Sequence, residues 1–293
     1  MSGLLIVTAD DVGLHRGTTL GALAAHDRGI VTACSVATVG RELDHAVELL
    51  RGCPELAVGV HLSLVGGTPL SPPSEVPSLV GRGGALLPDA SAFLRRWTTH
   101  RVNPEEVELE LRRQVEVLLD RGLTVAHVNS HQHLHVLPDV LAVVLRLAHA
   151  YGIPFVRTPV DRQPRGVAIW RALAVHGLGW LGRRAARKVR ARGLTTADAT
   201  IGVAGAGHLT TAGLVDLLGR TTQLTELVCH PGVGGEALAG AFPWGYGWDA
   251  ETAALCDPTV RSVLETAGLT LVRPDTPTVR DIAQAQRGPG ALT

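Results

Sequence analysis

Several features that mark particular classes of protein are scarce or missing in this chain of 293 residues. Aromatic residues make up only 3% of it, and Lys plus Arg and Asp plus Glu number 27 each, so the formal net charge is zero. This balance gives no reason to expect nucleic acid or an anionic membrane as a partner. No run of about 18 apolar residues predicts a membrane span, and no basic segment followed by an apolar stretch predicts a signal peptide.

Cysteine is scarce as well. The four cysteines are scattered without CxxC spacing, which indicates reduced thiols and a cytoplasmic protein. No GxGxxG follows the first apolar run, so a dinucleotide-binding fold is disfavoured. Hydrophobic residues make up 45% of the chain, which is enough for the core of one large α/β domain or two small ones.

What the chain does contain is a regular alternation of short apolar runs with longer helical patterns. Strands are expected at 4–9, 31–39 and 56–64, and in the segments that end near Ser130, Arg157 and His230. The clearest helix is "NPEEVELELRRQVEVLLDRG", in which Asn103 caps and Pro104 opens the first turn. Repeated strand–helix units predict a parallel sheet with crossover helices, and the length fits a barrel related to the (β/α)₈ type better than an open sheet.

The pattern predicts one barrel domain over residues 1–280 and a polar, flexible tail over 281–293. Residues 66–88 are rich in Pro, Gly and Ser and are too long for a simple connection, which favours a functional loop or lid. Residues 165–195 are Arg-rich and helical, and we interpret them as a pair of surface helices that could form a homodimer face.

Polar residues of similar chemistry recur at the expected strand ends. They are Asp10, Asp11, His61, His131, His133, His135, Arg157 and His230. Because active sites of parallel α/β proteins gather at the carboxyl ends of the strands, this recurrence predicts one site. One Asp with two His is a plausible ligand set for a catalytic divalent metal, which would leave a second carboxylate free to act as a base.

Two adjacent carboxylates, Asp10 and Asp11, follow the first apolar run. Neighbouring residues of a strand point to opposite faces, so both can face one site only if the strand ends there. Gly13 allows such a turn. A simpler interpretation is that one of them caps the following helix.

The segment "HVNSHQHLH" holds four histidines that would share one face in an extended chain. They cannot all bind one metal, and we expect at least one to be a ligand. His127 is interpreted as supporting or structural, and His135 as a cap or surface residue. Each single residue also has a plain structural interpretation: His61 as a core histidine, Arg157 as a buried ion pair and His230 as a turn residue before Pro-Gly.

Six segments together resemble the YdjC-like carbohydrate deacetylases, the family of the chitooligosaccharide deacetylases. They are "TADDVGLHRG", "GIVTACSVATVG", "AVGVHLSL", "HVNSHQHLHVLP", "VRTP" and "ELVCHPG", in family order between residue 4 and about residue 273. The resemblance implies a distorted (β/α) barrel of the glycoside hydrolase/deacetylase type with mostly parallel strands. It also implies one divalent metal ion, zinc or magnesium, held by Asp11, His61 and His131, and hydrolysis of an N-acetyl group on a sugar or glycoconjugate by a metal-activated water.

The arrangement is also similar to that of the NodB-type polysaccharide deacetylases, which implies roles for three further residues. Asp10 would be the base, Arg157 would orient it, and His230 would supply a proton or steady the tetrahedral intermediate. The chain departs from the family pattern at Val12, where Phe is common, and at Asn129, where Asp is common. A neutral amide at 129 would be a weaker acceptor for a metal-binding histidine.

Two other functions stay open at this point. A metal-dependent phosphoesterase of the His-rich barrel type would need more metal ligands and basic residues for phosphate. A non-catalytic sugar-binding protein would be expected to lack metal ligands. The aromatic residues of "AFPWGYGWD", which include Trp244, Tyr246 and Trp248, could stack on a sugar ring or anchor a loop.

Overall fold

The structure, a computed structural model, describes residues 3–161 and 169–285. The strands in these ranges are β1 (Leu4–Val12), β2 (Ala33–Val36), β3 (Ala57–Leu62), β4 (His127–Ser130), β5 (Phe155–Val156), β6 (Ala199–Ile201), β7 (Leu224–Cys229) and β8 (Thr270–Leu271). The helices are α1 (Arg16–Asp27), α2 (Leu43–Arg51), α3 (Ala90–Thr98), α4 (Pro104–Asp120), the 3₁₀ helix η1 (His131–Val136), α5 (Pro138–Ala150), α6 (Ile169–Ala191), α7 (Thr211–Leu218), α8 (Gly235–Ala241), α9 (Trp248–Leu255), α10 (Pro258–Thr266) and α11 (Pro277–Ala285).

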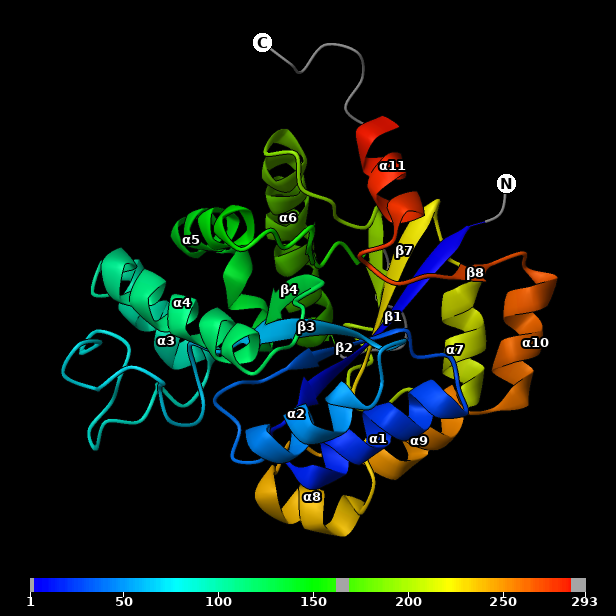
Figure 1. The fold of residues 1–293 in the computed structure, drawn as a ribbon, viewed down its shortest axis with the longest axis horizontal. Helices are drawn as coiled ribbons and strands as arrows, with labels where there is room; N and C mark the ends of the chain where they lie inside the picture. Colours follow the sequence, from blue (N-terminus) through cyan, green and yellow to red (C-terminus); the bar gives the residue numbers. More distant parts are fainter. Residues whose placement is uncertain (1–2, 162–168, 286–293) are drawn as a thin grey trace.

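The strands form one parallel sheet with helices packed around it (Figure 1). Their order is β5-β4-β3-β2-β1-β7-β6, and β8 pairs with the first two residues of β1. The two ends of this order approach each other, because Phe155 forms a bridge with Thr195 and the Thr200 N–H donates to the Val160 carbonyl at 3.1 Å. The sheet is therefore curled into a distorted barrel, and the predicted fold class is confirmed.

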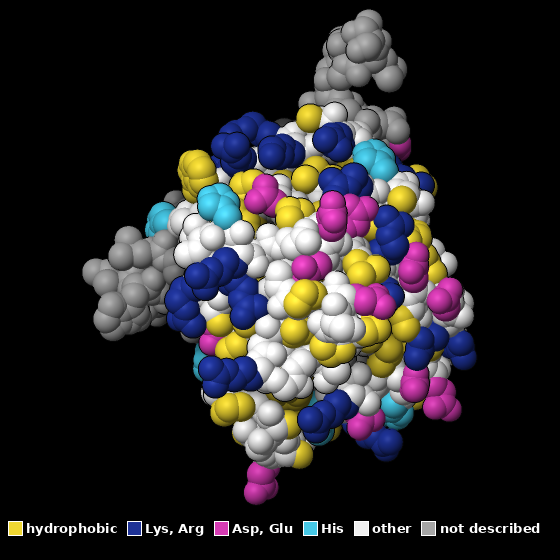
Figure 2. Space-filling model, turned by 90° about the vertical axis from the view of Figure 1, so that its left-hand side faces the viewer, with side chains coloured by type: hydrophobic (Ala, Val, Ile, Leu, Met, Phe, Trp, Pro, Cys, Tyr) yellow, Lys and Arg dark blue, Asp and Glu magenta, His cyan; other side chains and the backbone are white. Residues whose placement is uncertain are grey.

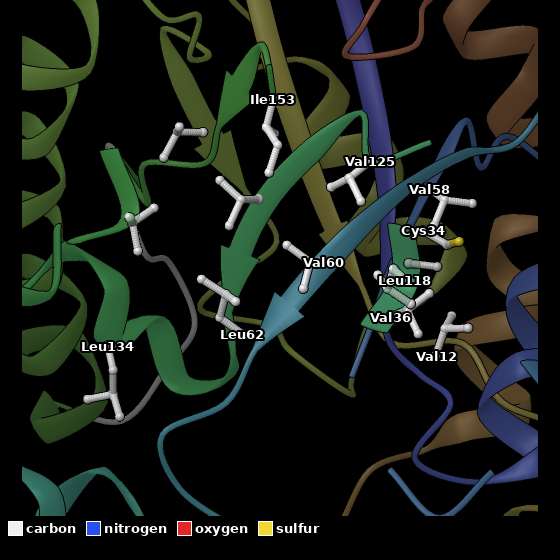
Figure 3. Packing of buried hydrophobic residues seen from close by; sticks show 14 of the residues in the cluster. Val12, Cys34, Val36, Val58, Val60, Leu62, Leu118, Val125, Leu134 and Ile153 are labelled. Carbon is white, nitrogen blue, oxygen red and sulfur yellow. The ribbon is translucent and has the colours of Figure 1, made fainter. Parts of the chain in front are cut away.

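Alternation along each strand separates an outward apolar face from the barrel interior. In β3, Val58, Val60 and Leu62 point outward and pack in the large core between sheet and helices (Figure 3). Gly59 and His61, the residues between them, point inward, as the two-residue period of a strand requires. The predicted α4 contributes to this core from outside, with Leu118 on its buried stripe.

The interior itself changes character along the barrel axis. Near the amino ends of the strands it is apolar and contains Ile6, Phe155 and Leu224. Val279 of α11 joins this cluster and is fully buried, so α11 covers that end of the barrel. The sequence predicted a flexible tail over residues 281–293, but residues 281–285 belong to α11. Residues 286–293 lie outside the described part.

Two other expectations about organisation need revision. The predicted pair of helices over 165–195 is wrong, because α6 runs as a single helix from Ile169 to Ala191, while residues 165–168 lie outside the described part. The homodimer stays a prediction. The segment 66–88 is irregular as expected, but it is fastened: the Glu110 carboxylate accepts hydrogen bonds from the N–H groups of Leu70 and Ser71.

Basic and acidic residues, which are equal in number in the sequence, are also mixed on the surface (Figure 2). Figure 2 shows basic, acidic and hydrophobic side chains interspersed over the face that forms the left-hand side of Figure 1. Among the described residues, no helix is long and apolar enough to cross a membrane.

Candidate metal centre and active site

Three side chains from different elements converge at the carboxyl end of the sheet. Asp11 Oδ1 lies 3.3 Å from His61 Nε2 and 3.3 Å from His131 Nδ1. The three atoms lie within 4.8 Å of one another, and they form the candidate metal-ligating group found among the described residues. The structure thus brings together the predicted ligands from β1, β3 and η1.

The backbone of β1 explains how both Asp10 and Asp11 reach the site. We expected the strand to end at these residues, but it continues to Val12. Its pairing with β2 is irregular between Ala9 and Val12. Asp11 adopts a left-handed conformation (φ 66°), which is uncommon for a residue with a side chain. The extra turn of the chain therefore occurs at Asp11 itself, as well as at Gly13.

The ring of His61 is oriented by its other nitrogen. His61 Nδ1 donates a hydrogen bond to Asn129 Oδ1 at 2.7 Å, because the amide oxygen can only accept. This leaves the Nε2 lone pair free on the side of Asp11, as a metal-binding histidine requires. Asn129 also donates to Asp10 Oδ1 and to the Ser35 hydroxyl, both at 3.0 Å.

The electrostatics of the ligand group fit a cation. Asp11 Oδ1 is buried and has no hydrogen-bond partner among the described residues, although two imidazole nitrogens face it. Burial disfavours the Asp11 carboxylate, but the rings of His131 and His61 outweigh this and hold its pKa well below the usual range. Burial also opposes the charged form of His61, and the carboxylates of Asp10 and Asp11 still raise its pKa. An ionised carboxylate facing two ring nitrogens is a suitable donor set for zinc, and also accommodates magnesium.

Asp10 lies beside this group in a fully bonded environment. Arg157 holds it with two hydrogen bonds, from Nη1 to Oδ2 at 2.5 Å and from Nη2 to Oδ1 at 2.9 Å. The Ser35 hydroxyl donates to Oδ1 at 2.7 Å. Burial alone would raise the pKa of Asp10, but the positive charge of Arg157 outweighs it and keeps the pKa well below its normal value.

Glu226 is a buried carboxylate that the sequence analysis missed. Its Oε1 accepts from Arg157 Nε at 2.9 Å and from the Thr8 hydroxyl at 2.9 Å, while Oε2 has no partner among the described residues. Burial raises the pKa of Glu226. The available signal was an acidic residue inside the apolar run "TELVC", where an unpaired charge would be costly.

His230 directly follows β7 and lines the same cavity as Asp10 and Asp11, which is described below. Its backbone N–H donates to Glu251 Oε1 at 2.5 Å, and its Nδ1 lies 4.0 Å from the same oxygen. Glu251 is fully buried in α9, and burial raises its pKa. Sequence reasoning did not single out Glu251, because only the fold brings α9 behind the residue after β7.

The histidine-rich segment is not extended, so the expectation that four histidines share one face is wrong. After β4 the chain turns into η1, with Gln132 and His133 in the left-handed region (φ 53° and 55°). His135 is neither a cap nor a surface residue: it is buried and bonded to Ser130 and to the Arg157 carbonyl. Burial lowers its pKa to about 4.

His127 fits the structural interpretation. It is fully buried in the barrel, and burial lowers its pKa to about 3. Its ring fills the space left by Gly59, where an added Cβ would lie 2.3 Å from His127 Nε2. His133, by contrast, reaches the cavity described next, and burial holds its pKa well below the usual value.

An inner cavity of about 390 Å³ collects these side chains. Its wall includes Asp10, Asp11, His61, Ser130, His131, Gln132, His133, Val203, Ala206, Val228, His230, Trp244 and Tyr246. Arg157 is fully buried and is not part of this wall, but its guanidinium is hydrogen-bonded to Asp10. Five of the six predicted site residues therefore share one cavity, and the sixth touches one of them.

A second cavity, the outer groove, measures about 580 Å³ and shares His131, Gln132 and Trp244 with the inner one. Its walls also include residues of segments 39–42, 63–67 and 241–244. The groove is therefore positioned to hold parts of a ligand that extend beyond the candidate metal centre.

The aromatic residues form a ladder along one wall of both cavities. Successive ring centroids lie 4.8 Å apart from Phe242 to Trp244, 5.5 Å from Trp244 to Tyr246 and 5.0 Å from Tyr246 to Trp248. Trp248 is only 1% exposed and anchors the segment. Trp244 and Tyr246 line the inner cavity, and the Trp244 ring lies 5.4 Å from that of His131. Stacking on a sugar ring stays a prediction for these two residues.

Comparison with known proteins identifies the group to which this chain is similar. A carbohydrate deacetylase from Halalkalibacterium halodurans is 38% identical over 166 residues, which is 57% of this chain and 68% of that protein. A carbohydrate deacetylase from Geobacillus stearothermophilus is 29% identical over 269 residues, covering 91% of this chain and 95% of the relative.

A solved structure shares the whole fold. The crystal structure of a proposed cellobiose-phosphate cleavage protein from Enterococcus faecalis V583 superposes with a TM-score of 0.76 at 26% identity. It covers 94% of this chain and 98% of its own. The family model for YdjC-like proteins matches residues 4–266, so the resemblance drawn from the sequence motifs is confirmed. The chain belongs to the YdjC-like protein family.

Proposed function

We propose that the protein is a metal-dependent carbohydrate deacetylase that hydrolyses an N-acetyl group on a sugar or glycoconjugate. One observation carries this proposal: a candidate three-ligand metal group and a separate carboxylate, Asp10, share one cavity at the carboxyl end of the barrel. The names of the relatives from Halalkalibacterium halodurans and Geobacillus stearothermophilus support the same activity.

Asp11, His61 and His131 would hold one divalent ion, zinc or magnesium. They fit it because Asp11 Oδ1 is buried without a hydrogen-bond partner among the described residues and faces both imidazole nitrogens. When bound, the ion supplies Lewis acidity, which lowers the pKa of water and polarises a carbonyl oxygen. Asn129 keeps His61 in the tautomer that leaves Nε2 unprotonated.

Asp10 is the residue we assign as general base. Its carboxylate would accept a proton from the attacking water, and the planar fork of Arg157 holds it ionised and aimed. The same fork makes Asp10 a weaker base, because it lowers the pKa of the carboxyl group. Orientation must therefore outweigh the loss of basicity.

His230 is assigned as the proton donor to the departing amine. Its Nδ1 is buried on the side of Glu251, so the proton would be delivered from Nε2.

The carbohydrate would lie against the aromatic ladder. Trp244 borders both cavities, so a sugar bearing the acetyl group could occupy the inner cavity while the rest of the molecule extends into the outer groove. Aromatic rings offer flat apolar surface with low side-chain entropy, which suits the faces of sugar rings.

The two alternatives are less well supported by the site. A phosphoesterase would need basic groups for phosphate, yet Arg157 is fully buried between Asp10 and Glu226. The described residues offer one group of three metal ligands and no second one. A non-catalytic sugar-binding protein would have no need for a complete ligand set beside a fully bonded carboxylate.

The test is to reconstitute purified protein with zinc or magnesium and to assay acetate release from a panel of N-acetylated sugars and glycoconjugates. We expect acetate from the metal-loaded protein and none after chelation. Release of phosphate from phosphorylated substrates, with two metal ions per chain, would favour the phosphoesterase. Sugar binding without release of acetate from any substrate would favour the non-catalytic alternative.

A further inference from the structure

The turn that follows β4 carries two consecutive residues in an unfavourable backbone conformation. Gln132 and His133 both have positive φ values (53° and 55°), although neither is glycine. Such conformations cost roughly 1–2 kcal/mol per residue and persist where the surrounding structure fixes them.

The turn is fixed from both sides. Gln132 Oε1 accepts a hydrogen bond from the Ala90 N–H at the start of α3, at 2.7 Å. On the inner side, Ser130 Oγ accepts from the His135 N–H at 3.0 Å, and His135 Nε2 donates to the Arg157 carbonyl at 2.8 Å. These bonds therefore fix the chain on both sides of His133.

The His133 ring is placed at the wall of the inner cavity. It is outside the candidate metal-ligating group, and its buried Nδ1 has no hydrogen-bond partner among the described residues. Its neighbour His135 differs in this respect, because both of its ring nitrogens have partners. A ring with an unpaired nitrogen in a partly buried position costs free energy unless a ligand completes its hydrogen bonds.

We propose that His133 is a substrate-binding residue, whose imidazole forms a hydrogen bond with a hydroxyl or the acetamido group of the bound sugar. The inference rests on the proposed function and assigns a residue outside the metal ligands and outside the Asp10 and His230 pair. The strained turn serves to present this ring to the cavity.

The test uses variants that the backbone accepts. Asn tolerates the left-handed region better than His, so His133→Asn should keep or raise Tm and retain the metal. Its shorter side chain withdraws the donor, and we expect KM for an N-acetylated sugar to rise about tenfold while kcat changes less. His133→Gln, which extends an amide N–H further into the cavity, should recover part of this loss.

His135→Gln is the matched control from the same turn. Because His135 is buried and bonded on both sides, this change should lower Tm. A His133→Asn variant with unchanged kcat/KM would overturn the inference, and so would one that loses the metal or Tm in proportion to its activity. If the wild-type protein releases no acetate from any substrate, the proposed function fails and this inference fails with it. If the wild-type protein is active and His133→Asn leaves kcat/KM unchanged, only this inference fails.

Discussion

The inner cavity has two walls that are built in different ways. The inner wall comes from strands and the residues that directly follow them, and it carries Asp10, His61 and, behind them, Arg157. The outer wall comes from the turn 131–133 and the aromatic segment 242–248, neither of which belongs to a strand. The two walls meet at His131, because its ring lies close to Asp11 of the inner wall and to the Trp244 ring of the outer wall.

The two walls also differ in how their side chains are fixed. Asp10 accepts hydrogen bonds from Ser35, Asn129 and Arg157 within the barrel. Trp244 and Tyr246 are only half-buried, and Trp244 meets its neighbours mainly through ring contacts. Preorganised polar groups serve the chemical step, whereas adaptable apolar surface serves binding. We therefore expect variants of the inner wall to lower kcat and variants of the outer wall to raise KM.

The largest effect is expected where the walls meet. His61→Ala and His131→Ala should each lose the metal, as measured by elemental analysis of the purified protein. With it they should lose acetate release by at least about 10³-fold, because the ion supplies several kcal/mol of stabilisation. The exposed His149→Ala is the matched control and should keep both properties. Full metal occupancy in both ligand variants would refute the assignment.

Asp10→Asn tests the inner wall without removing a ligand. We expect the metal content to stay normal while kcat falls by about 10²–10⁴-fold, since the amide cannot accept the proton. If the metal disappears together with the activity, Asp10 is a ligand and the base must be sought elsewhere.

Arg157→Lys should have a smaller effect in the same direction. Lysine keeps the charge but lacks the planar fork that meets both oxygens of Asp10, so orientation is lost. We expect a folded, metal-containing protein with kcat lowered about tenfold, which corresponds to roughly 1.4 kcal/mol of barrier. A kcat close to that of the wild type would show that the charge alone is needed.

The smallest effect on turnover is expected in the aromatic segment. Trp244→Ala should raise KM several-fold with kcat nearly unchanged, because the ring borders the substrate cavities but touches no proton-transfer group. Trp248→Ala is the matched comparison: this ring is buried, and its removal should cost about 3–5 kcal/mol of folding free energy, seen as a lower Tm. Equal KM for Trp244→Ala and wild type would exclude Trp244 from substrate binding.

Much of this site could be read from the sequence because strand patterns are local. Apolar runs of the right length predicted the parallel sheet, and parallel strands place the residues after them at one edge. This was enough to predict that Asp10, Asp11, His61 and His131 gather at one edge, whereas the family resemblance implied which three of them would be the metal ligands. The resemblance to the NodB-type deacetylases also implied that Arg157 would orient Asp10, and the two side chains are hydrogen-bonded in the structure.

Other features depended on chain segments that meet only in the folded protein. The orientation of Asp11 depends on its left-handed backbone conformation within β1. The apolar run before it predicts instead that the strand ends before Asp11. Glu226 and Glu251 are single acids within apolar patterns, and their partners lie far away in the sequence. The turn at Gln132 is held by Ala90, more than forty residues earlier.

The sequence by itself thus determined the class of fold and the chemical kind of site, because both follow from residue type and short-range periodicity. The tertiary structure alone decided which histidine faces the cavity and which is buried, with His133 and His135 only two residues apart. It also decided that α11 closes the barrel through Val279. These outcomes depend on strained backbone conformations and long-range hydrogen bonds, whose free energies are set by partners that no local pattern contains.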